Sequence, residues 1–311
     1  MVCSTGIRKP GPVKSTGENP GMKLFFSKYH GAGNDFIIID NRKKVFAPLN
    51  DREQSLIASL CHRRYGIGAD GLILIEKDAS ADFMMHYFNS DGRKGSLCGN
   101  GSRCAAAFAY HAIFPGRQQM RFNAVDGIHE ALVITPHPSR PFVSVTLNPA
   151  KKPVNIAPDN YFVNTGSPHL VRFVRNLDSV DVVNLGRQIR HAREWAPEGI
   201  NVNFVEDRGN NTLSVRTYER GVEDETLSCG TGVTAAAIAA WSHHHQDPQL
   251  TDYITLTSGG KLEVSFQSPD NHLDTFSNVR LKGPVQFVFS GELDIEALKQ
   301  AITTSDEPDE Q

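Results

Sequence analysis

A twelve-residue pattern occurs twice in this chain and constrains its fold more than any other feature. The segment CGNGSRCAAAFA begins at Cys98, and CGTGVTAAAIAA begins 131 residues later at Cys229. Six of the twelve positions are identical without a gap. Ala and Gly are common residues, but a matched Cys-Gly-x-Gly at both starts is hard to reconcile with chance. The repeat therefore predicts two domains of similar fold, each carrying one copy.

Each copy follows strand-like sequence and continues as a helix. The strand-like segments are apolar and rich in β-branched or aromatic residues, at 71–76 and 82–89 before the first copy and at 201–206 and 212–220 before the second. The Ala-rich segments 105–113 and 235–243 are apolar nearly all round, so we expect a sheet to wrap each helix. The predicted class is α/β (α+β), with two pseudo-symmetric domains, each a curved mixed β-sheet or barrel around a central α-helix.

A Pro- and Lys-rich turn region, NPAKKP (148–153), marks the expected domain boundary. A last helix is predicted for IEALKQAI (295–302). The expected parts are a disordered N-terminal extension (1–21), an N-terminal domain (22–148), a C-terminal domain (149–286) and a disordered acidic tail (303–311).

Composition excludes several classes of protein. The net charge of −3 and the scattered Lys and Arg residues give no basic face for nucleic acid. No apolar run is long enough to span a bilayer, and the first 21 residues lack the apolar stretch of a secretory signal, so we expect a cytoplasmic protein without a membrane partner. The number of cysteines, five, is odd, and no Cys/His set has zinc-ligand spacing. A disulfide framework and a metal site are therefore not expected.

The position of Cys98 and Cys229 favours thiol chemistry. Gly one and three residues after each cysteine is unusual in the first turn of a helix, because Gly is a poor helix former. Close approach of bare backbone N–H groups to a ligand is one reason for it. The same partial positive charge favours thiolate over thiol, so we expect the pKa of each cysteine to fall toward neutral pH.

Two such helix starts in pseudo-symmetric domains would face each other across a cleft. A carboxylate bound by the N–H groups would place its α-carbon between two sulfurs, where one thiolate removes the α-proton and the opposite thiol returns one to the other face. The sequence contains no pyridoxal-lysine motif and no dinucleotide fingerprint. No cofactor is therefore expected.

The simpler interpretation is that these cysteines are buried small residues. A single Cys at the start of an Ala-rich helix is more often packing than catalyst. Two copies with the same Gly spacing favour the catalytic interpretation. Cys104, matched by Ala235 in the second copy, stays with the packing interpretation, as do Cys61 and Cys3.

Over about residues 22–300 the chain resembles the diaminopimelate epimerase family. The resemblance rests on ordered motifs: HGAGNDF (30–36), RRYGIGADG (63–71), FNSDGRKGSLCGNGSRC (88–104), TGSPHLV (165–171), GINVNF (199–204) and YERGVEDETLSCGTG (218–232). It implies two similar domains, the first completed by about residues 287–302. It also implies cofactor-independent interconversion of LL- and meso-diaminopimelate, a small-molecule substrate used for lysine and peptidoglycan precursors. A homodimer is compatible with it.

The resemblance also assigns site residues. Cys98 and Cys229 would be the catalytic thiols, and His169 and Glu219 would modulate their protonation. Substrate contacts would come from residues that match the family's binding positions: Asn34, Asn89, Gly99, Asn100, Asn201, Glu219, Arg220, Gly230 and Thr231. Amide side chains suit a zwitterionic ligand because each donates and accepts, and Arg can bind a carboxylate through two hydrogen bonds.

Taken alone, each of these polar residues has a structural alternative. Asn34 and Asn89 are typical turn residues, and Glu219-Arg220 could be a solvated pair at a strand end. His169 could be structural, and the histidines at 243–245 are expected to interact with a helix C-terminus rather than a metal.

Three departures from the family pattern concern substrate contacts. Gly71 stands where many members have Gln, and Ser167 where many have Asn. One extra residue lies between Glu219 and Cys229. The open alternatives are a related two-thiol racemase of the proline or hydroxyproline type, whose members usually lack the HGxGNDF opening, and a thiol redox or ligand-binding protein with a reversible disulfide.

Overall fold

The computed structural model describes residues 23–45, 51–244, 247–249, 251–269 and 274–294. The expected extension at 1–21, the last helix at 295–302 and the acidic tail at 303–311 lie outside the described residues, as does Cys3.

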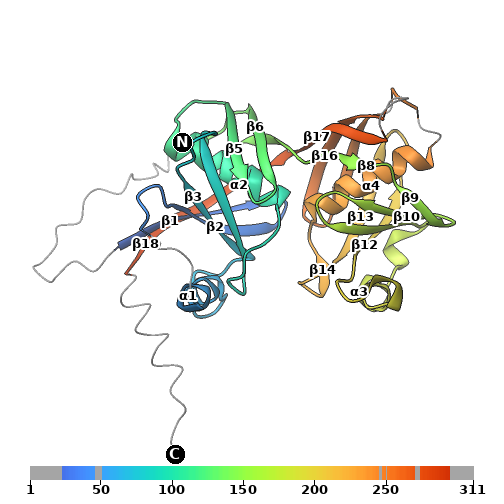
Figure 1. Cartoon of the computed structure of the whole chain (residues 1–311), viewed down its shortest axis with the longest axis horizontal. Coiled ribbons are helices and arrows are strands. Elements are labelled where there is room, and N and C mark those ends of the chain that lie inside the picture. Colours follow the sequence, from blue (N-terminus) through green and yellow to red (C-terminus); the bar gives the residue numbers. More distant parts are fainter. Residues whose placement is uncertain (1–22, 46–50, 245–246, 250, 270–273, 295–311) are drawn as a thin grey trace, which may run out of the picture.

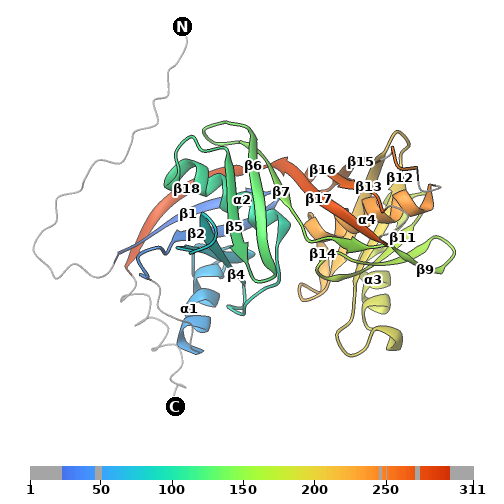
Figure 2. The ribbon, with the colours of Figure 1, turned by 45° about the horizontal axis from the view of Figure 1, so that its top comes forward.

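The first half of the chain forms a mixed sheet around one helix (Figure 1). Strand β1 pairs antiparallel with β2, which runs parallel to β3, and β3 pairs antiparallel with β4. Helix α1 lies on the outside of this sheet, whereas α2 lies within it (Figures 1 and 2). The elements are β1 (Lys23–Gly31), β2 (Asn34–Asp40), α1 (Asp51–Cys61), β3 (Gly71–Glu76), β4 (Phe83–Asn89), α2 (Gly99–Phe108), β5 (Gln119–Ala124), β6 (Gly127–Thr135) and β7 (Phe142–Thr146).

The second half repeats this arrangement, with α4 at its centre and α3 outside (Figure 1). Strand β11 runs parallel to β12, and β12 pairs antiparallel with β13, as β2, β3 and β4 do in the first half. The elements are β8 (Ala150–Lys151), β9 (Val154–Ala157), β10 (Asn160–Asn164), β11 (Pro168–Phe173), α3 (Val182–Arg190), β12 (Asn201–Asp207), β13 (Thr212–Glu219), β14 (Asp224–Thr226), α4 (Gly230–His243), β15 (Asp252–Thr257) and β16 (Gly260–Gln267). Three short helical turns complete the list, a π-helix at Ala109–Ile113 and 3-10 turns at Leu177–Ser179 and Arg193–Trp195.

The last two strands connect the halves. Strand β17 (Thr275–Pro284) pairs with β16 of the second half and with β7 of the first, and β18 (Gln286–Asp294) pairs antiparallel with β1. Figure 2 shows β17 crossing from one half to the other. The prediction of two similar α/β domains around central helices is confirmed.

Both central helices are buried because their sequences carry small apolar residues on every side. Ala105–Ala107 in α2 and Ala235–Ala237 in α4 have no exposed surface. Side chains of this size let the surrounding strands approach the helix axis, and continuous apolar faces require a partner all round. In the first half the regular helix ends at Phe108, and the chain continues as the π-helix to Ile113.

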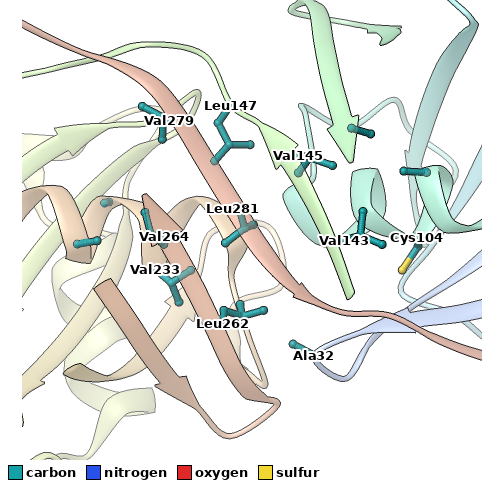
Figure 3. Close-up of a cluster of buried hydrophobic side chains, with 14 of the residues drawn as sticks. Ala32, Cys104, Val143, Val145, Leu147, Val233, Leu262, Val264, Val279 and Leu281 are labelled. Carbon is teal, nitrogen blue, oxygen red and sulfur yellow. The ribbon is translucent and has the colours of Figure 1, made fainter. Parts of the chain in front are cut away.

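A cluster of buried side chains fills the space between the two central helices. Leu281 of β17 lies between Val233 of α4 and the β7 residue Val143, with Leu262 beside it (Figure 3). The two halves therefore share one apolar core along β17, and the starts of α2 and α4 come together beside it.

Candidate active site

Cys98 and Cys229 cap the two central helices in the same backbone conformation. Each directly precedes the first helical residue, with φ and ψ of −106° and 111° at Cys98 and −108° and 112° at Cys229. This extended conformation turns the chain from the preceding loop into the helix. The repeat seen in the sequence is thus a repeat of three-dimensional geometry.

The starts of the two helices touch. A Cβ atom built on Gly230 would lie 3.4 Å from both the Cα of Gly99 and the backbone N of Asn100. The same atom would lie 2.9 Å from Cδ2 of Leu281, and one on Gly99 would lie 2.7 Å from that carbon. Glycine at both positions therefore leaves room for Leu281 beside the closely spaced helix starts.

A hydrogen bond joins the two halves at this contact. Nδ2 of Asn100 donates to the carbonyl oxygen of Ser228, at 3.0 Å, and Ser228 directly precedes Cys229. Asn100 is itself 1% exposed. The predicted residues Gly99, Asn100, Gly230 and the two cysteines therefore come together at one junction.

Asn34 accepts a hydrogen bond from the thiol of Cys98, with Sγ 3.6 Å from Oδ1. Its Nδ2 donates to Asp70 at 2.8 Å, which fixes the orientation of the amide. On the other side of the sulfur, the backbone N–H of Gly101 donates to Sγ at 3.4 Å. Asn34 is thus a partner of the thiol in this structure rather than a turn cap.

Cys229 lies among oxygen atoms. Its Sγ is 3.5 Å from the hydroxyl of Thr231, and the carboxylate of Glu219 is near enough to act electrostatically on its thiol. That carboxylate accepts a hydrogen bond from the hydroxyl of Thr226, at 2.9 Å. Burial raises the pKa of Glu219 above its ordinary value.

The pKa values of the two thiols differ from expectation. Burial raises the pKa of Cys98 to about 11, although the N–H groups of Gly101 and Asn100 oppose the shift. Burial raises the pKa of Cys229 further, and Glu219 adds to the shift. The prediction that the helix starts bring both thiols toward neutral pKa is wrong for this structure, because loss of solvation outweighs the N–H groups.

His169 is fully buried and held as a neutral ring. Nδ2 of Asn203 donates to its Nδ1 at 3.0 Å, which leaves the proton on Nε2. Nε2 lies 3.0 Å from the hydroxyls of both Thr231 and Ser167. Burial lowers the pKa of His169 to about 3. The hydroxyl of Thr231 therefore stands between His169 and Cys229.

Asn201 and Arg220 lie close to His169, whereas no contact of Asn89 with either cysteine is seen in the described residues. Nδ2 of Asn201 donates to the carbonyl of Pro168 at 3.0 Å, and its Oδ1 accepts the backbone N–H of Arg220 at 2.9 Å. The positive charge of Arg220 acts on His169. Asn89 is exposed at the end of β4, directly opposite Gly71 of β3.

Tyr87 is a residue of this region that sequence reasoning missed. Its ring fills the space beside Gly71 and Gly95, where a Cβ would lie 2.6 Å and 2.4 Å from ring carbons. Burial raises the pKa of Tyr87 well above its ordinary value, and Cys98, Glu219 and Asp70 raise it further. The ring thus explains why residue 71 has no side chain, and its hydroxyl faces the acidic groups of the junction.

Among the residues that the structure describes, no helix has the length and apolar character that crossing a membrane requires.

Comparison with known proteins identifies relatives of this chain. The family model described as "Diaminopimelate epimerase" matches residues 26–149 and 161–288, one segment in each half. The chain is 47% identical to a diaminopimelate epimerase of Flavobacterium psychrophilum, over 86% of this chain and 98% of that protein. It is 42% identical to one of Chlorobaculum tepidum, over 84% of this chain and 98% of that protein.

Solved structures share the fold at much lower identity. A phenazine biosynthesis protein of the PhzF family from Bacillus anthracis gives a TM-score of 0.66 at 15% identity, covering 87% of this chain and 99% of its own. A hydroxyproline epimerase from Agrobacterium vitis, with bound trans-4-hydroxy-L-proline, gives 0.65 at 13% identity, covering 88% and 93%.

Proposed function

This chain belongs to the diaminopimelate epimerase family, and we propose that it interconverts LL- and meso-diaminopimelate without a cofactor, with Cys98 and Cys229 as the paired acid and base. The observation that carries the proposal is the contact between two helix starts of the same geometry, each capped by a cysteine. The protein is an isomerase, and its place is in lysine and peptidoglycan-precursor biosynthesis.

The α-carboxylate of the substrate binds where the helices meet. The first N–H groups of both helices point out of the helix toward this junction, and the partial positive charges of two helix ends add there. Gly99 and Gly230 permit the close approach, while Asn100 and Thr231 supply the next N–H groups. This position leaves the α-carbon between the two sulfurs.

One thiolate removes the α-proton, and the opposite thiol delivers a proton to the other face. Burial keeps both thiols protonated until substrate arrives. The α-ammonium group of the substrate brings a positive charge close to the sulfurs, which lowers the pKa of a nearby thiol. That thiol releases its proton to solvent, and the resulting thiolate takes the α-proton. The reverse reaction exchanges the roles of the two cysteines.

The polar residues around the sulfurs determine which cysteine holds a proton and which is a thiolate. The negative charge of Glu219 raises the pKa of the Cys229 thiol, so it favours Cys229 as the acid. Neutral His169 donates to Thr231, whose hydroxyl can then donate to a thiolate at Cys229 when the roles reverse. Asn34, Asn89, Asn201 and Arg220 bind the zwitterionic substrate through amides and a guanidinium.

The test is proton exchange at the α-carbon in heavy water. Purified, fully reduced protein is incubated with LL-diaminopimelate, and α-deuteration and meso product are followed by NMR. We expect Cys98→Ala and Cys229→Ala to lose at least about a thousandfold in epimerisation. Cys104→Ala, fully buried in α2, is the matched control and keeps most of the activity.

Three outcomes would contradict the proposal. Exchange with L-proline or hydroxyproline, and none with diaminopimelate, would favour the related racemase. Absence of turnover for every amino acid under full reduction would favour a redox or ligand-binding protein. A loss in Cys104→Ala as large as in Cys98→Ala would remove Cys98 from its assigned role.

The proposal extends to the setting of the enzyme. We propose a first domain of residues 22–148, completed by about 287–302, and a second domain of 149–286. The pairing of β18 with β1 supports the return of the chain to the first domain. We expect a cytoplasmic protein with no nucleic-acid partner, and a homodimer is compatible with this function. Light scattering of the purified protein and fractionation of the source cells test these points.

A further inference from the structure

Arg103 is the largest fully buried side chain in the described part of the protein, and it lies one turn inside α2 from Cys98. Within the described ranges no carboxylate forms an ion pair with it, and its Nε has no hydrogen-bond partner. A buried charge without a counter-charge costs several kcal/mol. Such a residue requires an explanation beyond packing.

The structure makes room for this guanidinium between two strands. A Cβ on Gly31 of β1 would lie 3.2 Å from Nη2 of Arg103, and one on Gly283 of β17 would lie 3.5 Å from Nε. Nη1 donates to the carbonyl of Gly99 at 3.4 Å, and Nη2 donates to Oδ1 of Asn100 at 2.9 Å.

The bond to Asn100 fixes the orientation of that amide. Because Oδ1 of Asn100 accepts from Arg103, its Nδ2 points the other way, where it donates to the carbonyl of Ser228 and to Oδ1 of Asn34. Ser228 precedes Cys229, and Asn34 accepts from Cys98. One guanidinium thus stands behind the contacts of both cysteines.

Charges around the two sulfurs are unequal. Arg103 acts on Cys98 from within α2 and opposes the rise that burial causes in the pKa of its thiol. Burial lowers the pKa of Arg103 itself to about 10, so the guanidinium stays charged at neutral pH. Glu219 of β13 raises the pKa of both thiols, and Tyr87 of β4 faces Cys98. Behind Arg103 lies the thiol of Cys104, with Tyr29 of β1 beyond it.

We propose that Arg103 is a positioning residue that orients Asn100 and supplies the positive charge that makes Cys98 the more readily ionised of the two thiols. It does not touch substrate. The proposal rests on the two-thiol function above, but the thiol titration that tests it needs no substrate. If the titration contradicts the role of Arg103, the epimerase assignment is unaffected. If the protein does not turn over diaminopimelate, the titration still tests the effect of Arg103 on Cys98.

The test is the pH dependence of alkylation by iodoacetamide, read at each cysteine by peptide mass spectrometry. In the wild-type protein we expect the midpoint for Cys98 to lie at least about one pH unit below that for Cys229. Arg103→Gln keeps an amide donor but removes the charge, so the Cys98 midpoint rises by about one unit while Cys229 moves much less. Arg103→Lys keeps the charge without the planar fork, so the midpoint stays near wild type while kcat falls about tenfold. Arg280→Gln, on the surface of β17, is the matched control and changes neither midpoint.

Three results would overturn the proposal. In the first, the alkylation midpoint of Cys98 in the wild-type protein is no lower than that of Cys229. In the second, folded Arg103→Gln leaves the Cys98 midpoint unchanged. In the third, Arg103→Lys raises the Cys98 midpoint as much as Arg103→Gln does. Circular dichroism establishes folding of each variant. If Arg103→Gln does not fold, the order of the two wild-type midpoints and the Arg103→Lys profile still decide.

Discussion

The contact between the two helix starts can be tested by coupling two substitutions across it. Leu281 is fully buried, and its Cδ2 is the nearest atom to a Cβ on either Gly99 or Gly230. Leu281→Ala removes that carbon and leaves a cavity, at a cost of about 3 kcal/mol in the free energy of unfolding. Gly230→Ala gains about 0.5–1 kcal/mol of helix propensity. With a Cβ 2.9 Å from Leu281, however, overpacking costs about 1–3 kcal/mol, so the variant is destabilised on balance.

In the Leu281→Ala background the close contact is gone, and only contacts of 3.4 Å with Gly99 and Asn100 remain. Gly230→Ala should then become neutral or stabilising. We expect a coupling of about 1–2 kcal/mol in favour of the double variant.

Urea unfolding followed by tryptophan fluorescence measures the stability of the wild type, the two single variants and the double variant. Gly186→Ala in α3 is the control, because its Cβ would meet Tyr218 rather than Leu281, so its cost should add to that of Leu281→Ala. If Gly230→Ala and Leu281→Ala also add within about 0.5 kcal/mol, the helix starts do not meet at Leu281 and the packing argument is refuted.

Three further predictions concern the site. Tyr87→Phe should raise KM for diaminopimelate about tenfold with little change in kcat, because it removes a hydroxyl that faces the junction and could bind the polar substrate. Tyr253→Phe, whose buried hydroxyl has no partner in the described residues, should leave KM unchanged. Gly71→Ala should lower stability by about 1–3 kcal/mol in thermal melts, since its Cβ would lie 2.5 Å from the Phe88 carbonyl oxygen, and wild-type stability would contradict this. The pKa of His169 is lowered from 6.5 to about 3, so the unfolded chain binds a proton that the folded protein refuses, and stability falls as pH drops from about 6.5 toward 3. His169→Gln should remove about 1.4 kcal/mol per pH unit from that slope in urea titrations at several pH values, and an unchanged slope would show that His169 is protonated in the fold.

The fold was predictable because the repeat is local. Cys-Gly-x-Gly followed by small apolar residues indicates both the helix start and the need for an enclosing sheet. The two central helices were therefore predictable from a twelve-residue pattern that occurs twice. Their contact follows less directly, since it depends on β17, which joins β16 to β7 across residues far apart in sequence.

The thiol environment was less accessible to sequence reasoning. The sequence indicated N–H groups at each cysteine, but the degree of burial that raises both pKa values is a property of the packed junction. Tyr87 lies within a strand-like run, and only its two glycine neighbours in space mark it as a residue of the site. Arg103 lies in the motif FNSDGRKGSLCGNGSRC (88–104), but nothing in the sequence indicated that its side chain would be buried.

The repeat explains why unequal charges near Cys98 and Cys229 matter. Two identical helix starts would give two equal thiols, and equal thiols provide no preference for which one holds the proton. Arg103 of the first copy aligns with Thr234 of the second, and both donate to the carbonyl of the glycine four residues earlier. The backbone role is thus conserved between the copies, while only the first copy carries a charge. Glu219 is the opposite charge on the side of Cys229. Because the two charges act in opposite directions on a pseudo-symmetric pair, neutralising Arg103 should bring the ionisation of Cys98 closer to that of Cys229.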